Sequence, residues 1–179
     1  MDKKEIKRQA MQMLEAGRSK TETFKALSGG VVKDKVLAYW IGSRPDPQLL
    51  ERHAGKIKIL LGLIYAQALF GLVGGYFLGL TISAGFAIVL GLLAGGISLL
   101  FAWGFYRNSA QTYTVYTLLS ISQVPRMFKD YAEDPVSVII GVVTTLAMVF
   151  FVAWVKNLLF PDLGFMGSKK IKGQFVFSN

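Results

Sequence analysis

The chain of 179 residues contains no cysteine and a single histidine, His53. The lack of cysteine excludes disulfides, thiol catalysis and Cys-ligated zinc or iron–sulfur clusters. One histidine cannot supply the pair of an HExxH zinc site, and the sequence has no Walker phosphate-binding loop and no GxSxG nucleophile motif. A lone histidine among basic residues is typical of a solvated surface group. We therefore predict that the protein is not an enzyme and needs no cofactor or metal.

Charged residues are missing from a long internal stretch. Between Ile59 and Tyr106 there is no Asp, Glu, Lys, Arg or His. A bilayer core about 30 Å thick needs about 20 apolar residues as helix, so this stretch is long enough for two crossings and a short turn. Its residues do not alternate as those of barrel strands do. The sequence predicts a tight transmembrane helical hairpin over residues 59–106, bent near Thr81.

Small residues recur every four positions inside this hairpin. The first span carries Gly71, Gly75 and Gly79, and the second carries Ala87, Gly91 and Gly95. This spacing places each trio on one helix face, where missing side chains let two backbones approach closely in lipid. We predict that these faces pack the hairpin together. The alternatives are contact with a second copy or a partner subunit, and a pore-forming glycine zipper.

A few polar groups lie deep in the first span, among them Gln67, Tyr65 and Tyr76. Polar side chains inside lipid-spanning helices usually form hydrogen bonds between helices, and we predict that role here. No ionisable acid or base lies in the interior of any predicted span. Such groups usually mark proton relays, ion paths or intramembrane active sites, so their absence also argues against catalysis.

A third apolar stretch, residues 135–160, is long enough to cross the membrane. It is preceded by Asp134, an acidic N-cap, and begins with Pro135, which suits the first helical position. Trp154 and Lys156 lie near its end and are typical of a membrane interface. The sequence therefore predicts three transmembrane helices, a hairpin plus one.

The segment between the hairpin and the third span, residues 107–134, is more polar than the spans but rich in aromatic residues. Polar and aromatic residues in this mixture are typical of a segment that lies in the interface, here on the cytoplasmic side. The pattern leaves residues 107–125 open between a helix, an extended segment and a fourth crossing.

The N-terminal residues 1–44 predict a soluble domain of three short helices. Ser19 and Glu22 have the spacing of a capping box, which marks the start of the second helix. A linker with two prolines and a juxtamembrane turn follow over residues 45–58. Domains of about 40 residues rarely bury enough surface to be stable alone. We therefore expect the membrane surface or another protein to supply the missing burial.

Two partners compete for this small domain. The candidate contact residues are Lys33, Lys35, Tyr39 and Trp40 in the third helix. Two helices joined by a short Gly-containing turn also match a helix-turn-helix DNA reader. The third helix, however, offers no Arg, Asn or Gln to read bases, so nucleic acid is an unlikely partner. A protein partner, or a second copy of the chain, is the preferred prediction.

The net charge of +9 and the sequence pI of about 9.8 come from an uneven distribution of basic residues. Thirteen Lys and Arg lie at or before Lys58, three lie within 107–134, and four lie from Lys156 onward. Cytoplasmic loops carry the excess of such residues. With three crossings, the N-terminus is predicted to be cytoplasmic and the tail, residues 161–179, to lie outside.

Basic side chains just before the first span are predicted to contact lipid headgroups. They are Arg52, Lys56 and Lys58. Their long aliphatic stems let the charged ends reach phosphates while the helix enters the apolar region.

These inferences predict an all-α integral protein of the bacterial inner (plasma) membrane. Its layout, with short helices, a Pro-Asp-Pro linker and then lipid spans, resembles the general plan of small bacterial membrane proteins, which implies no activity. The predicted function is that of a non-catalytic accessory or assembly subunit whose cytoplasmic helical domain holds a partner at the membrane. A membrane-tethered DNA-binding regulator and a subunit of a small transporter or channel are the alternatives.

Overall fold

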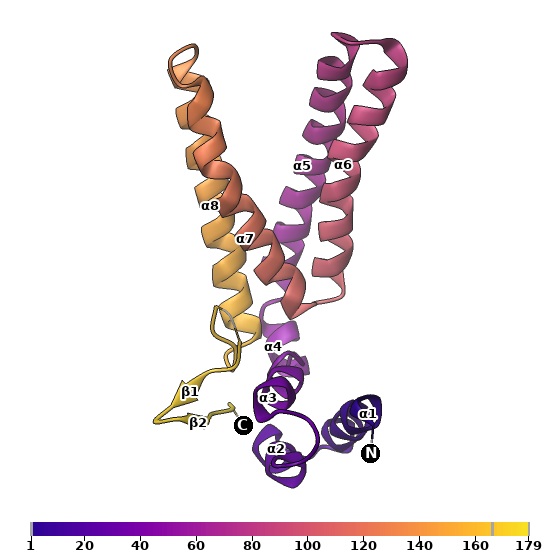
Figure 1. Ribbon diagram of the computed structural model, residues 1–179, viewed down its shortest axis with the longest axis vertical. Helices are drawn as coiled ribbons and strands as arrows, with labels where there is room; N and C mark the ends of the chain where they lie inside the picture. Colours follow the sequence, from indigo (N-terminus) through magenta and orange to yellow (C-terminus); the bar gives the residue numbers. More distant parts are fainter. Residues whose placement is uncertain (1, 166, 179) are drawn as a thin grey trace. The chain divides into compact units, whose positions relative to one another are not determined.

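The computed structural model describes residues 2–165 and 167–178, and most of them are helical (Figure 1). The chain forms two compact units. The terminal unit contains both ends of the chain, residues up to 51 and residues from 156 onward. The helical unit contains residues 52–155.

The terminal unit begins with short helices. They are α1 (Lys3–Glu15), α2 (Lys20–Leu27), α3 (Asp34–Gly42) and α4 (Pro47–Arg52). At the start of α2 the capping box is present: the Ser19 hydroxyl accepts from the Glu22 amide at 3.2 Å, and the Glu22 carboxylate accepts from the Ser19 amide at 3.2 Å. The chain leaves α1 at Gly17, whose φ of +81° favours glycine.

The C-terminal tail forms a small antiparallel hairpin from β1 (Lys170–Ile171) and β2 (Gln174–Phe175). Its two turn residues, Lys172 and Gly173, both have positive φ, as a two-residue type I′ turn requires. The tail packs on α2, because the rings of Phe175 and Phe177 lie 5.4 and 5.5 Å from the ring of Phe24.

One hydrophobic core joins the tail to the N-terminal helices. Its buried members are Ile6, Ala10, Val32, Leu37, Ala38, Ile41 and Phe177. The tail and the N-terminal helices therefore belong to one unit, an arrangement that does not agree with the predicted placement of the tail opposite the N-terminus. A charge count cannot detect this packing. The burial that the N-terminal helices lack comes from the tail of the same chain.

The helical unit contains four helices and one short 3₁₀ turn. They are α5 (Ala54–Leu80), α6 (Ala84–Tyr106), α7 (Ala110–Met127), η1 (Phe128–Asp130) and α8 (Pro135–Leu159), whose last turn belongs to the terminal unit. Three of these helices, α5, α6 and α8, are long and apolar enough to cross a membrane. At the start of α8 the predicted N-cap is present, because the Asp134 carboxylate accepts from the Ser137 amide at 3.1 Å.

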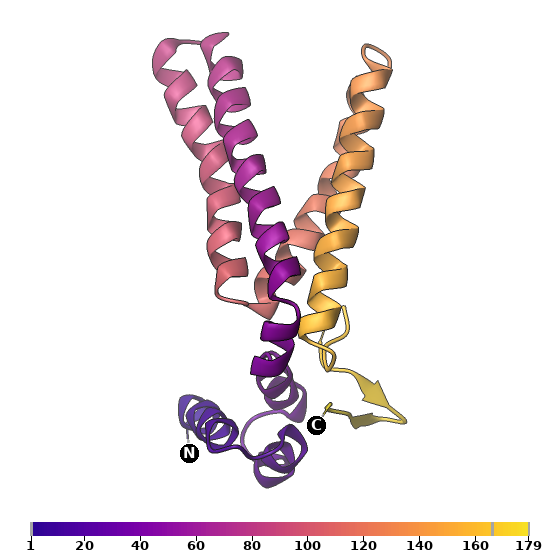
Figure 2. The ribbon, with the colours of Figure 1, turned by 180° about the vertical axis from the view of Figure 1, so that it is seen from behind.

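The helices of this unit run alternately in opposite directions. The turn between α5 and α6 and the turn between α7 and α8 lie at the same end of the unit (Figures 1 and 2). At the other end, the Lys56 ammonium of α5 lies 5.5 Å from the Trp154 ring of α8. Part of the segment predicted to lie in the interface forms α7, a helix of 18 residues, and a helix is one of the alternatives that the sequence left open for residues 107–125.

Candidate functional site

The six small residues predicted to form a packing face are brought together between α5 and α6. A Cβ added at Gly75 would stand 2.8 Å from the Leu90 carbonyl oxygen, and one added at Gly91 would stand 2.9 Å from the Leu72 carbonyl oxygen. Gly79 meets Ala87 at the turn end of the hairpin, and Gly71 and Gly95 face the other helix farther down. The backbones touch here because no side chain separates them.

Other glycines of the same helices have open surroundings. An added Cβ at Gly62, Gly74 or Gly96 would meet nothing within 4 Å. Gly74 and Gly75 are neighbours in α5, but only a Cβ at Gly75 would collide with α6. The close approach is therefore specific to the four-residue series.

The candidate partner contacts of α3 have different surroundings. Lys33 and Lys35 are exposed at the start of the helix. Trp40 packs partly against the hydrophobic core, and the Lys7 ammonium lies 5.7 Å from its ring. Tyr39 is half-buried, and this burial raises the pKa of its hydroxyl. The lysines are thus free to meet a partner, whereas Trp40 also serves the core.

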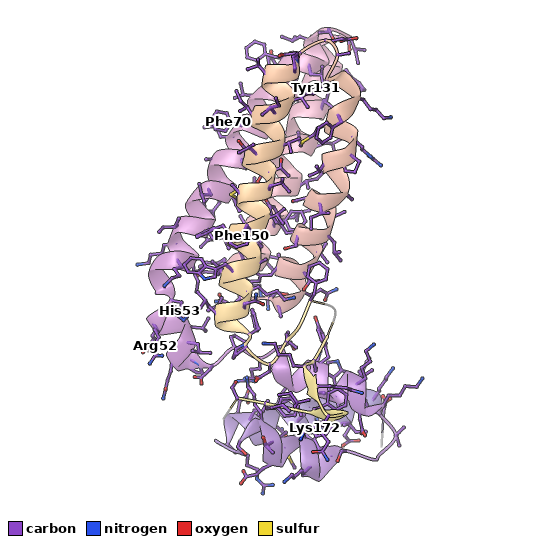
Figure 3. The ribbon with its side chains drawn as sticks, turned by 90° about the vertical axis from the view of Figure 1, so that its left-hand side faces the viewer. Arg52, His53, Phe70, Tyr131, Phe150 and Lys172 are labelled. Atoms are coloured by element: carbon purple, nitrogen blue, oxygen red, sulfur yellow. The ribbon has the colours of Figure 1, made fainter. Side chains whose placement is uncertain are left out.

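The predicted headgroup contacts lie around the start of α5. Arg52 and Lys58 are exposed, and the Lys56 ammonium lies 3.4 Å from Nδ1 of His53 as well as beside Trp154. Desolvation, followed by the charges of Lys56 and Arg52, lowers the pKa of His53. Arg52 and His53 are adjacent in Figure 3. Burial and the neighbouring positive charges thus both disfavour the charged form of this histidine.

Sequence reasoning missed a buried ionic site in the terminal unit. The Asp162 carboxylate, only 2% exposed, accepts from the Lys20 ammonium at 2.6 Å and from the Ser178 hydroxyl at 2.7 Å. Next to it, Leu163 packs on α3 so closely that a Cβ at Gly42 would stand 3.1 Å from a Leu163 methyl group. These contacts tie α2, α3 and the tail together. The only signal in the sequence is a lone acid among the lysines of the tail.

A second missed feature is a cavity of about 540 Å³ bordered by α5, α7 and α8. Gln67 lines it and accepts a hydrogen bond from the Tyr116 hydroxyl of α7 at 2.9 Å, so the predicted hydrogen bond between helices is confirmed for this residue. Tyr65 and Tyr76 are largely exposed instead. The sequence did not indicate which residue would bond to Gln67, because the conformation of residues 107–125, which contain Tyr116, was left open.

No protein-family model, no curated protein and no solved structure matches the chain significantly. Among the described residues, no group of three or more His, Asp or Glu side chains could hold a metal ion. The function therefore has to be argued from the contacts and charges of the chain itself.

Proposed function

We propose that the protein is a non-catalytic subunit of the bacterial inner membrane and that its terminal unit holds a partner protein on the cytoplasmic side. The proposal is supported by the way both chain ends fold into one basic domain. Such a domain is connected to the apolar helices at two points, through the start of α5 and the end of α8.

The proposed topology has four crossings, with α7 as the fourth. Both chain ends belong to one unit, so the number of crossings must be even, and α7 is the remaining helix of suitable length. Its 18 residues span about 27 Å at 1.5 Å per residue, close to the thickness of the apolar core. Of all the Lys and Arg in the chain, only Arg126 and Lys129 then lie on the outer side. This distribution follows the positive-inside rule more closely than the three-crossing arrangement does.

The observation that carries the proposed function is the surface at the turn between α2 and α3. Val31 is 76% exposed there, and the exposed Lys33 and Lys35 follow it. The turn has a defined shape, because the Asp34 carboxylate accepts from the Gly29 amide at 3.0 Å. An apolar side chain held beside two ammonium groups suits a partner surface that carries acidic residues around an apolar pocket.

The arrangement of α3 weighs against a DNA reader. Four residues of this short helix are buried, namely Leu37, Ala38, Ile41 and Gly42. The tail covers part of its second half through Leu163. A recognition helix has to enter the major groove with several free polar side chains, and α3 has few to offer.

The test is purification of the full chain from native membranes in mild detergent. We expect a partner protein to copurify, and we expect the combined change Lys33→Glu and Lys35→Glu to abolish copurification while the protein stays folded. The matched control is Lys3→Glu with Lys4→Glu, which reverses two exposed charges on α1. Equal loss in both variants, or tight sequence-specific binding of duplex DNA by the full chain, would contradict the proposal.

A further inference from the structure

We infer that the cavity bordered by α5, α7 and α8 is a binding site for an uncharged lipid, which it holds by hydrogen bonds to the carbonyl oxygens of that lipid. The inference rests on the proposed crossing of α7, because only then does the cavity open into the membrane. Its evidence is independent of the partner surface on the terminal unit.

The size and the rim of the cavity fit a ligand that enters from the bilayer. Its volume of about 540 Å³ lies within the range of about 300–1,000 Å³ that is usual for small-molecule sites. Two of its lining residues, Phe70 and Leu63 of α5, are 76% and 43% exposed, so the cavity opens on the outer surface of the helical unit. Met127 and Met148 line it as well, and their flexible side chains adapt to varied apolar shapes.

The polar lining is a chain of hydrogen bonds that ends in a donor. Ser120 is hydrogen-bonded to Tyr116, and the Tyr116 hydroxyl donates to the side-chain oxygen of Gln67 at 2.9 Å. The amide nitrogen of Gln67 is then left to donate into the cavity. On α7 the Gln123 side chain also lines the cavity, and it makes no hydrogen bond within the described part of the chain. The amide nitrogens of Gln67 and Gln123 are donors, and a ligand with acceptor oxygens satisfies them.

The uncharged lining of the cavity and the surrounding hydrocarbon restrict the kind of ligand further. No Asp, Glu, Lys, Arg or His lines the cavity, so a charged headgroup would lose its hydration without gaining a counter-charge. Amide donors facing hydrocarbon are unfavourable unless they are hydrogen-bonded. An uncharged lipid with ester or quinone carbonyls satisfies the donors, and its chains match the apolar walls.

The test measures lipid binding to the full chain by native mass spectrometry in detergent micelles. Three probes are titrated separately: dioleoylglycerol, ubiquinone-2 and the anionic dioleoylphosphatidylglycerol. We expect one or both uncharged probes to bind at the cavity, and the two arms distinguish an ester from a quinone source. We expect binding of the anionic probe, if any, to be unaffected by changes in the cavity.

Two variants test the site in different ways, one by filling the cavity and one by removing a hydrogen-bond donor. Gly141→Leu places a side chain in the cavity where an added Cβ meets nothing within 4 Å, so we expect uncharged-lipid binding to weaken at least tenfold while the fold is retained. Gln123→Leu removes a donor, and we expect a two- to tenfold loss, about the value of one hydrogen bond. The controls are Gly96→Leu, another glycine with open surroundings, and Gln111→Leu, an exposed glutamine of α7 outside the cavity.

Three outcomes would overturn the inference. The first is binding of the anionic probe alone. The second is uncharged-lipid binding that both cavity variants leave unchanged. The third is a dimer that Gly141→Leu dissociates, since the cavity would then be an interface between two copies. Failure of the α7 crossing is a separate result, because a reporter fused after residue 132 would then read cytoplasmic.

Discussion

The two units of this molecule are held together in different ways. In the terminal unit, large apolar side chains from both ends of the chain, such as Ile6 and Phe177, share one core beside a buried ion pair. In the hairpin of the helical unit, α5 and α6 are neighbours in sequence and meet through glycines, with no ion pair at the contact. The difference follows from the solvent. Water drives large apolar side chains together, whereas lipid gives no such gain and favours close backbone contact.

The comparison also explains how each unit depends on the rest of the chain. The hairpin has its contact surfaces in adjacent segments and a turn of a few residues. The terminal unit is complete only after α8 has been made and the tail has returned to α2. We therefore expect the terminal unit to be sensitive to changes in the tail and the hairpin to be independent of them.

The prediction with the largest measurable difference concerns membrane topology, that is, on which side of the membrane each end of the chain lies. Reporters fused after residues 30 and 175 should both read cytoplasmic, and a reporter fused after residue 132 should read outside, because the two ends share a core. Paired alkaline phosphatase and fluorescent protein fusions measure this. An outside reading at residue 175 would break the comparison, since the two ends could not then form one unit.

A smaller but still large effect is expected from Asp162→Ala. The change leaves the part-buried Lys20 ammonium without its partner, and breaking a buried pair in this way costs about 3–5 kcal/mol of stability. The loss is measured by unfolding the protein with denaturant and monitoring the hydrogen exchange of the backbone amides of the terminal unit. Glu51→Ala, an exposed acid of the same unit, is the control and should change little.

The effect of a single Gly→Ala change on the stability of the hairpin should depend on which glycine is replaced. Gly75→Ala forces a Cβ against the Leu90 carbonyl and should lower stability by about 1–3 kcal/mol. Gly74→Ala should be neutral or stabilising by up to about 1 kcal/mol, because alanine is the better helix former and the position is open. Unfolding in mixed detergent micelles compares the two. Equal losses at both positions would mean that the close contact between α5 and α6 does not exist.

The smallest expected effect concerns pH. The folded protein lowers the pKa of His53 below its ordinary value of about 6.5, so the unfolded chain binds the proton more readily. Stability should therefore be full above about pH 6.5 and fall as pH drops through the interval between that value and the lower folded pKa. NMR titration of the single histidine measures the folded pKa directly. Lys56→Gln should raise the pKa of His53. An unchanged pKa would show that the charge of Lys56 does not contribute to the shift.

Much of the fold follows from local patterns. The charge-free stretch predicts long apolar helices, and α5 and α6 are both long and apolar enough to span. Ser19 with Glu22, and Asp134 before Pro135, mark the starts of helices because capping needs only residues within one turn. Such signals are readable in sequence because each partner lies a few residues away.

The tertiary structure decided the rest. The sequence by itself determined the three apolar helices, the caps and the four-residue spacing of glycines, since each depends on neighbouring residues. It did not determine that Phe177 completes the core of α1 and α3, that Asp162 pairs with Lys20, or that α7 places Tyr116 beside Gln67. These contacts join residues far apart in the chain, and their energy exists only once the helices are packed. The hydroxyl groups of Thr114, Thr117 and Ser122 bond to carbonyls of α7 itself, whereas the Tyr116 hydroxyl meets Gln67 of α5 only in the folded protein.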